Sequence, residues 1–155
     1  MVCLGNICRS PMAAAVAAAM VEDAGLGGEV VVESFGTAGC HESEPAYRRA
    51  TEALRRGGWP VIEHRARRLR PPDLAAADLV LCADRANLAE VRSLAGAGDG
   101  GAKVRLLRSY DSEAGPGDDE VPDPWGGDDA EFDQVLALLE RACRGLVAEL
   151  ARASR

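Results

Sequence analysis

The sequence predicts an α/β fold with a parallel sheet. Short apolar and β-branched runs alternate with longer helix-forming segments along the 155 residues, and this alternation is typical of βαβ units. A chain of this length can bury a core without disulfides or a structural metal. Neither an internal repeat nor a shift in composition marks a boundary, so we expect residues 1–155 to form a single domain.

Four apolar runs are the expected strands, over residues 1–3, 30–32, 79–82 and 104–107. Helices are expected over residues 12–24, 45–56, 84–94 and about 129–152. Ser10 is suited to the N-cap of the first helix, with Pro11 at its first position and Gly25 at its end. Asp84 is suited to the N-cap of the third helix. The last helix has apolar residues at spacings of three and four, so one face should pack on the core. Residues 95–102 and 115–120 are expected to be loops.

The composition limits the classes of partner. The formal net charge is −7, whereas nucleic acid and anionic membranes attract a basic surface. The five cysteines are odd in number and scattered, which is typical of reduced thiols in a cytoplasmic protein. No apolar run reaches the roughly 18 residues of a membrane span, and no signal peptide is visible. We therefore expect a cytoplasmic protein without nucleic-acid or membrane partners, as a monomer or a weak dimer.

The sharpest feature lies between the first expected strand and the first helix, in the segment Cys3-Leu4-Gly5-Asn6-Ile7-Cys8-Arg9-Ser10-Pro11. A short loop that leads into a helix points several backbone N–H groups into one concavity, and the helix dipole behind it favours an anion. Gly5 and Asn6 are residue types that tolerate the left-handed backbone of such a nest. The segment therefore predicts a binding site for a tetrahedral oxyanion such as phosphate.

Cys3 and Arg9 are the candidate catalytic pair of this loop. Cys3 is expected at its floor, where the helix N-terminus, Arg9 and the Ser10 hydroxyl favour the nucleophilic thiolate. Arg9 is expected at the rim, where its planar fork can bind two equatorial oxygens of a phosphoryl group. A cysteine and an arginine at this spacing also occur together by chance, and a lone cysteine at a strand end is more often a core residue. Gly-Asn inside the loop and Ser-Pro after it favour the catalytic interpretation.

A candidate proton donor lies far along the chain, in the segment Val121-Pro122-Asp123-Pro124-Trp125-Gly126-Gly127. Cleavage of a phosphate ester leaves an alkoxide or phenolate, which Asp123 could protonate before it deprotonates the water that clears a phosphocysteine. Trp125 could flank an aryl ring. Asp-Pro is also a common turn dipeptide, so only its combination with the cysteine loop favours a catalytic Asp123.

Taken together, these segments resemble the low-molecular-weight protein tyrosine phosphatase family over nearly the whole chain. Weaker similarities lie between them, at Ser34, His64, Arg67, residues 82–84 and residues 106–111. The resemblance implies a three-layer fold: a four-stranded parallel sheet with helices on both faces and a phosphate-binding loop after strand 1. It also implies a hydrolase without metal or other cofactor, acting on phosphotyrosine-containing proteins or small aryl phosphates.

The resemblance assigns roles to individual residues. Cys3 is the implied nucleophile, Arg9 the phosphate ligand, and Asp123 the general acid and then base. Contacts with phosphate or substrate are implied for Leu4, Gly5, Asn6, Ile7, Cys8, Ser10 and Trp125. Ser34 and His64 are implied to support the loop, His64 as a structural residue and not a proton carrier. Cys8 matches the family's second loop cysteine, which either protects Cys3 as a reversible disulfide under peroxide or is inert.

The sequence also departs from the family pattern. Only Met1 and Val2 precede the nucleophile, where family members usually carry several strand residues. Cys40 stands where the family commonly has an aromatic on the pocket wall, and Tyr47 where it has an aspartate. Trp125-Gly126 replaces a frequent pair of tyrosines, so Trp125 is expected to be the aromatic wall and regulation by phosphorylation of those tyrosines is not expected.

Three alternative functions remain open. Protein arginine phosphatases resemble this chain in both segments, but they carry threonine at the position of Ile7, and a bulky isoleucine should favour a flat aryl phosphate over a guanidinium. Arsenate reductases linked to thioredoxin need two further cysteines in a flexible segment, and Cys82 has no such partner nearby. A phosphopeptide-binding pseudoenzyme would usually lack the cysteine or the aspartate, and both are present.

Overall fold

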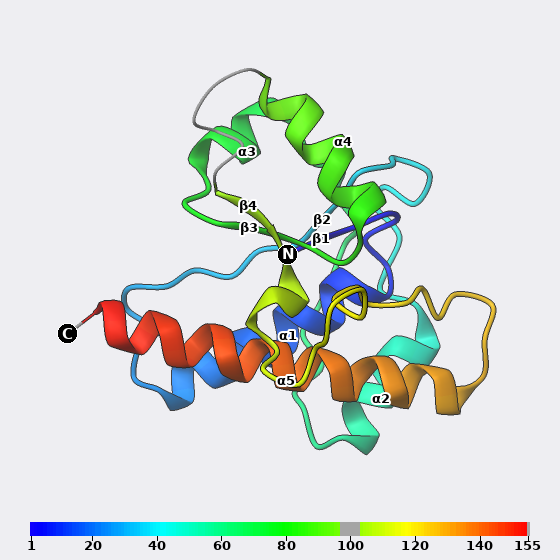
Figure 1. The fold of residues 1–155 in the computed structure, drawn as a ribbon. Helices are drawn as coiled ribbons and strands as arrows, with labels where there is room; N and C mark the ends of the chain where they lie inside the picture. The colour runs from blue at the N-terminus through cyan, green and yellow to red at the C-terminus, as the bar shows by residue number, and fades with distance from the viewer. Residues whose placement is uncertain (97–102, 155) are drawn as a thin grey trace.

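The chain folds around one sheet of four short parallel strands (Figure 1), in a computed structural model that describes residues 1–96 and 103–154. The strands are β1 (Val2–Cys3), β2 (Phe35–Gly36), β3 (Val80–Cys82) and β4 (Val104–Leu106). Their order across the sheet is β2-β1-β3-β4, and all three pairings are parallel. The predicted α/β class and the four-stranded parallel sheet are therefore confirmed.

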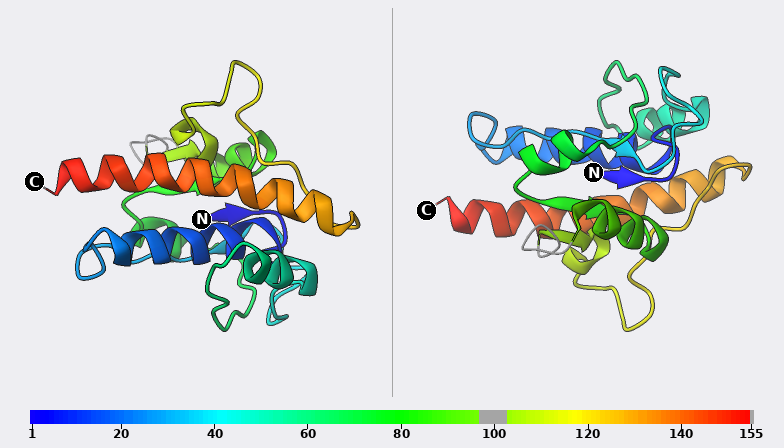
Figure 2. Two further views of the ribbon diagram at one scale, coloured as in Figure 1. Left: turned by 90° about the horizontal axis from the view of Figure 1, so that it is seen from below. Right: turned by 90° about the horizontal axis from the view of Figure 1, so that it is seen from above.

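Helices cover both faces of this sheet, as expected for a parallel sheet. On one face lie α1 (Arg9–Asp23), α2 (Arg48–Arg56) and α5 (Asp129–Ala153). On the other face lie α3 (Pro71–Ala76) and α4 (Arg85–Ala95). A 3-10 turn, η2 (Leu107–Tyr110), follows β4. Figure 2 shows α1 and α5 side by side along the sheet. Within the described residues, no helix has the length and apolarity to cross a membrane.

The short strands divide the core between the two helical layers. Successive side chains of a strand point to opposite faces. Val2 and Cys82 accordingly pack in the cluster beneath α3 and α4, whereas Cys3 and Leu81 pack in the cluster beneath α1, α2 and α5. Because Cys3 is the last residue of β1, this alternation places its sulfur on the α1 face, at the carboxyl ends of the strands.

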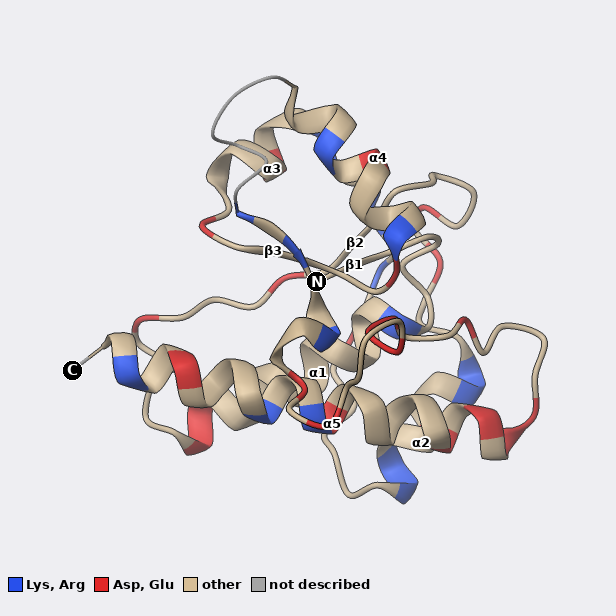
Figure 3. Cartoon of the chain, in the orientation of Figure 1, with Lys and Arg blue, Asp and Glu red and all other residues tan. Residues whose placement is uncertain are grey.

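The longest helix carries its own start signals. Asp128 caps α5 by accepting from the backbone N–H of Glu131, whose side chain accepts from the N–H of Asp128 in return. Acidic residues lie in the first turn and Arg152 in the last, the distribution that the helix dipole favours (Figure 3). The prediction of a final helix over about 129–152 is confirmed.

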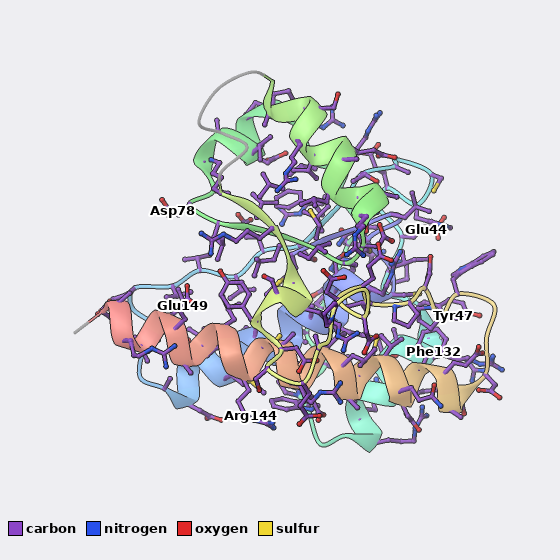
Figure 4. All side chains as sticks on the ribbon, in the orientation of Figure 1. Glu44, Tyr47, Asp78, Phe132, Arg144 and Glu149 are labelled. Carbon is purple, nitrogen blue, oxygen red and sulfur yellow. The ribbon has the colours of Figure 1, made fainter. Side chains whose placement is uncertain are left out.

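The start of α2 is fixed against α5 by an aromatic pair. The ring centroids of Tyr47 and Phe132 are 5.8 Å apart (Figure 4). The backbone N–H of Tyr47 also donates to the carbonyl of Ile7 across 2.7 Å. Tyr47 therefore joins the start of α2 to both α5 and the cysteine loop.

One expected strand is wrong. Residues 30–32 form no strand, and Val31 is 86% exposed. The chain pairs instead through Phe35 and Gly36, which lie opposite Val2 and Cys3. Since β1 has only two residues, it offers no partner to the valines, and β-propensity alone does not make a strand.

Helix boundaries also differ from the prediction. The first helix begins at Arg9 with Cys8 at the N-cap, so Ser10 is a helical residue and not the cap. The second begins at Arg48 instead of residue 45, and Leu107 opens η2 instead of ending β4. The short α3 was not expected, because six residues give little periodicity. Asp84 does cap α4, accepting from the N–H of Asn87 at 2.8 Å. Residues 97–102 of the loop expected over 95–102 lie outside the described residues.

Candidate active site

The segment from Cys3 to Arg9 forms a tight loop between β1 and the first turn of α1. Asn6 has a φ of 56°, the left-handed conformation expected for it. Gly5 does not have a positive φ, contrary to expectation. A Cβ there would lie 2.9 Å from Cδ2 of His41, so any larger residue would have to displace the His41 ring.

Cys3 is buried beneath this loop and faces a hydroxyl. Its Sγ lies 3.0 Å from Oγ of Ser10. The same hydroxyl accepts from Nδ2 of Asn6 at 2.8 Å and can donate to the Phe35 carbonyl at 3.2 Å. The hydroxyl has a single proton. That proton can serve the Phe35 carbonyl when Cys3 is a thiol and turn to the sulfur when Cys3 is a thiolate.

Asn6 is fully buried and connects the loop to its surroundings. Its Nδ2 also donates to Oγ of Ser34 at 3.0 Å, and its Oδ1 accepts from the backbone N–H of Arg67 at 2.8 Å. Nε2 of His64 donates to the Asn6 carbonyl at 2.7 Å. The predicted support residues Ser34 and His64 are thus in contact with the loop. The backbone N–H of Arg67 also binds Asn6, and a backbone contact of this kind cannot be predicted from the identity of the side chain.

His64 is held as a neutral donor. Burial lowers its pKa, and the charge of Arg67 lowers it further, against the opposite influence of the hydrogen bond to Asn6. Because a carbonyl can only accept, the proton of the neutral ring lies on Nε2. This arrangement suits structural support of the loop.

Arg9 is buried, with 3% of its side chain exposed, and does not lie at a rim as the sequence suggested. Its Nη1 donates to Oδ2 of Asp84 at 2.7 Å and to the Val121 carbonyl at 3.0 Å. Its Nη2 donates to Oδ2 of Asp123 at 3.2 Å. Asp84 was not among the predicted site residues. Its position directly after β3, at the same edge of the sheet as the loop, was the signal available.

Asp123 comes to the loop from a segment 114 residues away from Arg9 in the chain. Its Oδ1 accepts from the backbone N–H of Trp125 at 3.2 Å, and its side chain is 43% exposed. The N–H of Val121 donates to the Ala83 carbonyl at 2.8 Å, which anchors the segment beside β3. Asp123 is therefore held within reach of both Arg9 and solvent.

One pocket of about 200 Å³ lies at the cysteine loop. Its lining residues are Cys3, Leu4, Gly5, Ile7, Cys8, Arg9, Cys40, His41, Asp123 and Trp125. Trp125, which is 61% exposed, lines the pocket and is accessible to solvent. Cys40 does occupy the wall, and His41 beside it was not predicted. In the parts of the chain that the structure describes, no cluster of three or more His, Cys, Asp or Glu side chains could hold a metal ion.

Cys8 is the second thiol of the pocket. Burial raises its pKa to about 12, and the negative charges of Asp123 and Cys3 add to this effect. Cys8 therefore remains a thiol at neutral pH, unlike a thiolate nucleophile.

Comparison with known proteins agrees with this geometry. The family model described as "Low molecular weight phosphotyrosine protein phosphatase" matches residues 1–155. The chain belongs to the low-molecular-weight protein tyrosine phosphatase family. A low molecular weight protein-tyrosine-phosphatase of Streptomyces coelicolor is 46% identical over 147 residues, which cover 95% of this chain and 89% of that protein. The human low molecular weight phosphotyrosine protein phosphatase is 35% identical over 147 residues, covering 94% and 90%.

Solved structures of phosphatases share the fold. YfkJ from Bacillus subtilis has a TM-score of 0.88 at 32% identity, covering 99% of this chain and 94% of that one. A protein tyrosine phosphatase from Entamoeba histolytica has a TM-score of 0.92 at 28% identity, covering 99% and 96%. The resemblance seen in the cysteine loop and the Asp-Pro segment thus extends to the whole family fold.

Proposed function

We propose that this family member hydrolyses phosphotyrosine and small aryl phosphates through a phosphocysteine on Cys3. The observation that supports this most is that Asp123, 114 positions after Arg9, lines the same pocket as Cys3 and Arg9. The relatives named as tyrosine phosphatases support the substrate class.

The first half of the proposed reaction transfers the phosphoryl group to sulfur. The dianion lies in the β1–α1 loop, against backbone N–H groups at the start of α1 and the Arg9 guanidinium. The Cys3 thiolate attacks phosphorus as the bond to the aryl oxygen breaks. Asp123 donates a proton to that oxygen, so the product leaves as a neutral phenol.

The second half reverses the role of Asp123. Its carboxylate takes a proton from a water molecule as that water attacks the phosphorus of phosphocysteine. The P–S bond breaks, inorganic phosphate forms, and Cys3 returns as a thiolate stabilised by Ser10. Because the cycle needs a free thiol, we also propose a reducing, cytoplasmic setting.

The test is turnover of phosphotyrosine and an aryl phosphate by the wild type and by Cys3→Ser. Turnover is expected only in the wild type, together with a covalent phosphoenzyme that a rapid acid quench retains. Substantial turnover by Cys3→Ser would show that the nucleophile is another residue. Equal activity after treatment with a chelator is also expected, since no step uses a metal.

A side-by-side assay with phosphoarginine addresses the alternative substrate. Ile7 lines the pocket and is 6% exposed, so its bulk contacts whatever group follows the phosphate. We expect the wild type to favour phosphotyrosine and Ile7→Thr to shift the ratio toward phosphoarginine. A wild type that favours phosphoarginine would assign the other substrate class.

A further inference from the structure

The loop that carries Asp123 has little apolar anchorage. Residues 111–128, between η2 and α5, contain no helix or strand. Beyond Asp111, only Val121 and Pro124 of this loop are buried. An unsupported loop of this length would sample many conformations, and each would place the carboxyl group of Asp123 differently. Something other than apolar packing must define its path.

Arg108 supplies one restraint from the base of the loop. This arginine of η2 has only 1% of its side chain exposed. Its Nη1 donates to Oδ1 of Asp118 and to the Glu120 carbonyl, each at 3.0 Å. Its Nε and Nη2 both donate to Oδ2 of Asp111 at 3.2 Å. The guanidinium thus joins Asp111, at the start of the loop, to Asp118 and Glu120, which come shortly before Asp123 in the chain.

The side chain of Glu120 joins this part of the loop to the N-terminus of α4. Its Oε1 accepts from the backbone N–H of Arg85 at 2.6 Å, and the Arg85 side chain donates to Asp119 at 2.6 Å. The residue before Arg85 is Asp84, the partner of Arg9. Figure 3 shows acidic stretches of this loop close to arginine-bearing segments. Residues 118–120, which lead to Asp123, are therefore held by hydrogen bonds from both η2 and α4.

We infer that Arg108, acting through Asp118 and the Glu120 carbonyl, is a positioning residue for Asp123. The inference rests on the proposed function, because it concerns the delivery of a proton by Asp123. Within the described residues, the side-chain hydrogen bonds of Arg108 are made to groups of residues 111–120 and not to the cysteine loop. Loosening this tether should therefore impair protonation of the leaving group and spare the attack by Cys3.

Asp118→Asn is the informative variant. The Asp118 side chain is 75% exposed, so its change leaves the core intact, whereas replacing buried Arg108 would also break its buried ion pair with Asp111. The control is Asp133→Asn, which removes an exposed ion pair (2.7 Å) between Asp133 of α5 and Arg56 of α2, away from the loop. The readout is kcat/KM across aryl phosphates, from phenyl phosphate to dinitrophenyl phosphate, with thermal unfolding measured in parallel.

We expect Asp118→Asn to lower kcat/KM about three- to tenfold for phenyl phosphate and less than about twofold for dinitrophenyl phosphate, whose leaving group needs no proton. Asp133→Asn should match the wild type on both substrates. An equal loss on both substrates, or no loss on either, would overturn the inference and leave the proposed function standing, provided that Asp123→Ala shows the leaving-group dependence. If Asp123→Ala lowered kcat/KM equally for both substrates, Asp123 would not be the general acid. The inference about Arg108 would then fail as well.

Discussion

Arg9 donates to Asp84 across 2.7 Å, and this partly buried ion pair joins the cysteine loop to the start of α4. The other oxygen of Asp84 accepts from the N–H of Asn87, so one carboxylate both caps α4 and orients Arg9. Nη1 is held by Asp84 and the Val121 carbonyl and Nη2 by Asp123, so the guanidinium is oriented where it lines the pocket. Pre-orientation of this kind is what a planar phosphate ligand requires.

The first prediction concerns this pair. Asp84→Asn should lower kcat/KM for an aryl phosphate about ten- to a hundredfold, because a hydrogen bond to a charged group contributes roughly 1.5–3 kcal/mol. Inhibition by inorganic phosphate should weaken as well, since Arg9 contacts phosphate in both the ground state and the transition state. Asp73→Asn is a matched control, because Asp73 accepts from the Arg70 N–H at the start of α3. Unchanged kinetics in Asp84→Asn would mean that Arg9 is oriented by the remaining contacts alone.

The second prediction concerns the thiolate. Ser10→Ala removes the only side-chain hydroxyl that contacts Cys3 among the described residues. Alkylation of Cys3 by iodoacetamide at about pH 6 should slow about tenfold, because the thiolate is the reactive form and loses a donor. Ser109→Ala provides the comparison, since that hydroxyl bonds to the Leu106 carbonyl. If both variants alkylate at the wild-type rate, the Ser10 proton stays on the Phe35 carbonyl throughout.

The third prediction concerns stability and pH. The pKa of His64 is lowered in the folded protein, so the unfolded chain takes up the proton first as the pH falls. The contribution of neutral His64 is therefore complete above its unfolded pKa of about 6.5 and is lost below it. His64→Gln should show a smaller difference in Tm between about pH 7.5 and pH 5.5 than the wild type. Equal differences in Tm would mean that the protonation of His64 does not contribute to the pH dependence of stability.

The sequence predicted those parts of the fold whose signals are local. Asp84 caps α4 because the capping residue and its target are three positions apart, and the apolar spacing of α5 reflects one continuous face. The strand predicted at residues 30–32 is wrong because a strand needs a pairing partner as well as β-propensity, and β1 pairs with Phe35 and Gly36 instead. No local pattern encodes that register.

The site divides in the same way. The cysteine loop is contiguous, so its residues could be named together. The need for a proton donor beside that loop favoured Asp123, and the whole-chain resemblance added His64. Asp84 and Arg9 are 75 positions apart, and the only signal for their pairing is that Asp84 follows a strand at the same edge of the sheet as the loop. The role of Arg108 was equally hidden, since a buried arginine is recognised only once its carboxylate partners are in place.

The last prediction concerns Cys8 as a guard of Cys3. Peroxide should oxidise the Cys3 thiolate to a sulfenic acid first, because the pKa of about 12 keeps Cys8 protonated. The Cys8 sulfur can then attack that sulfenic acid, so a Cys3–Cys8 disulfide forms and water leaves. Dithiothreitol should restore most of the activity of the wild type and much less of that of Cys8→Ala, in which Cys3 is free to oxidise irreversibly.

Cys40→Ala is the control that separates the two neighbouring thiols, since Cys40 is exposed and lines the same pocket. Its recovery should equal that of the wild type, and mass spectrometry of the oxidised wild type should find Cys3 linked to Cys8. Recovery that is intact in Cys8→Ala but lost in Cys40→Ala would assign the guard to Cys40. The exposed Cys40 thiol would then form the disulfide with oxidised Cys3, and buried Cys8 would only contribute to packing.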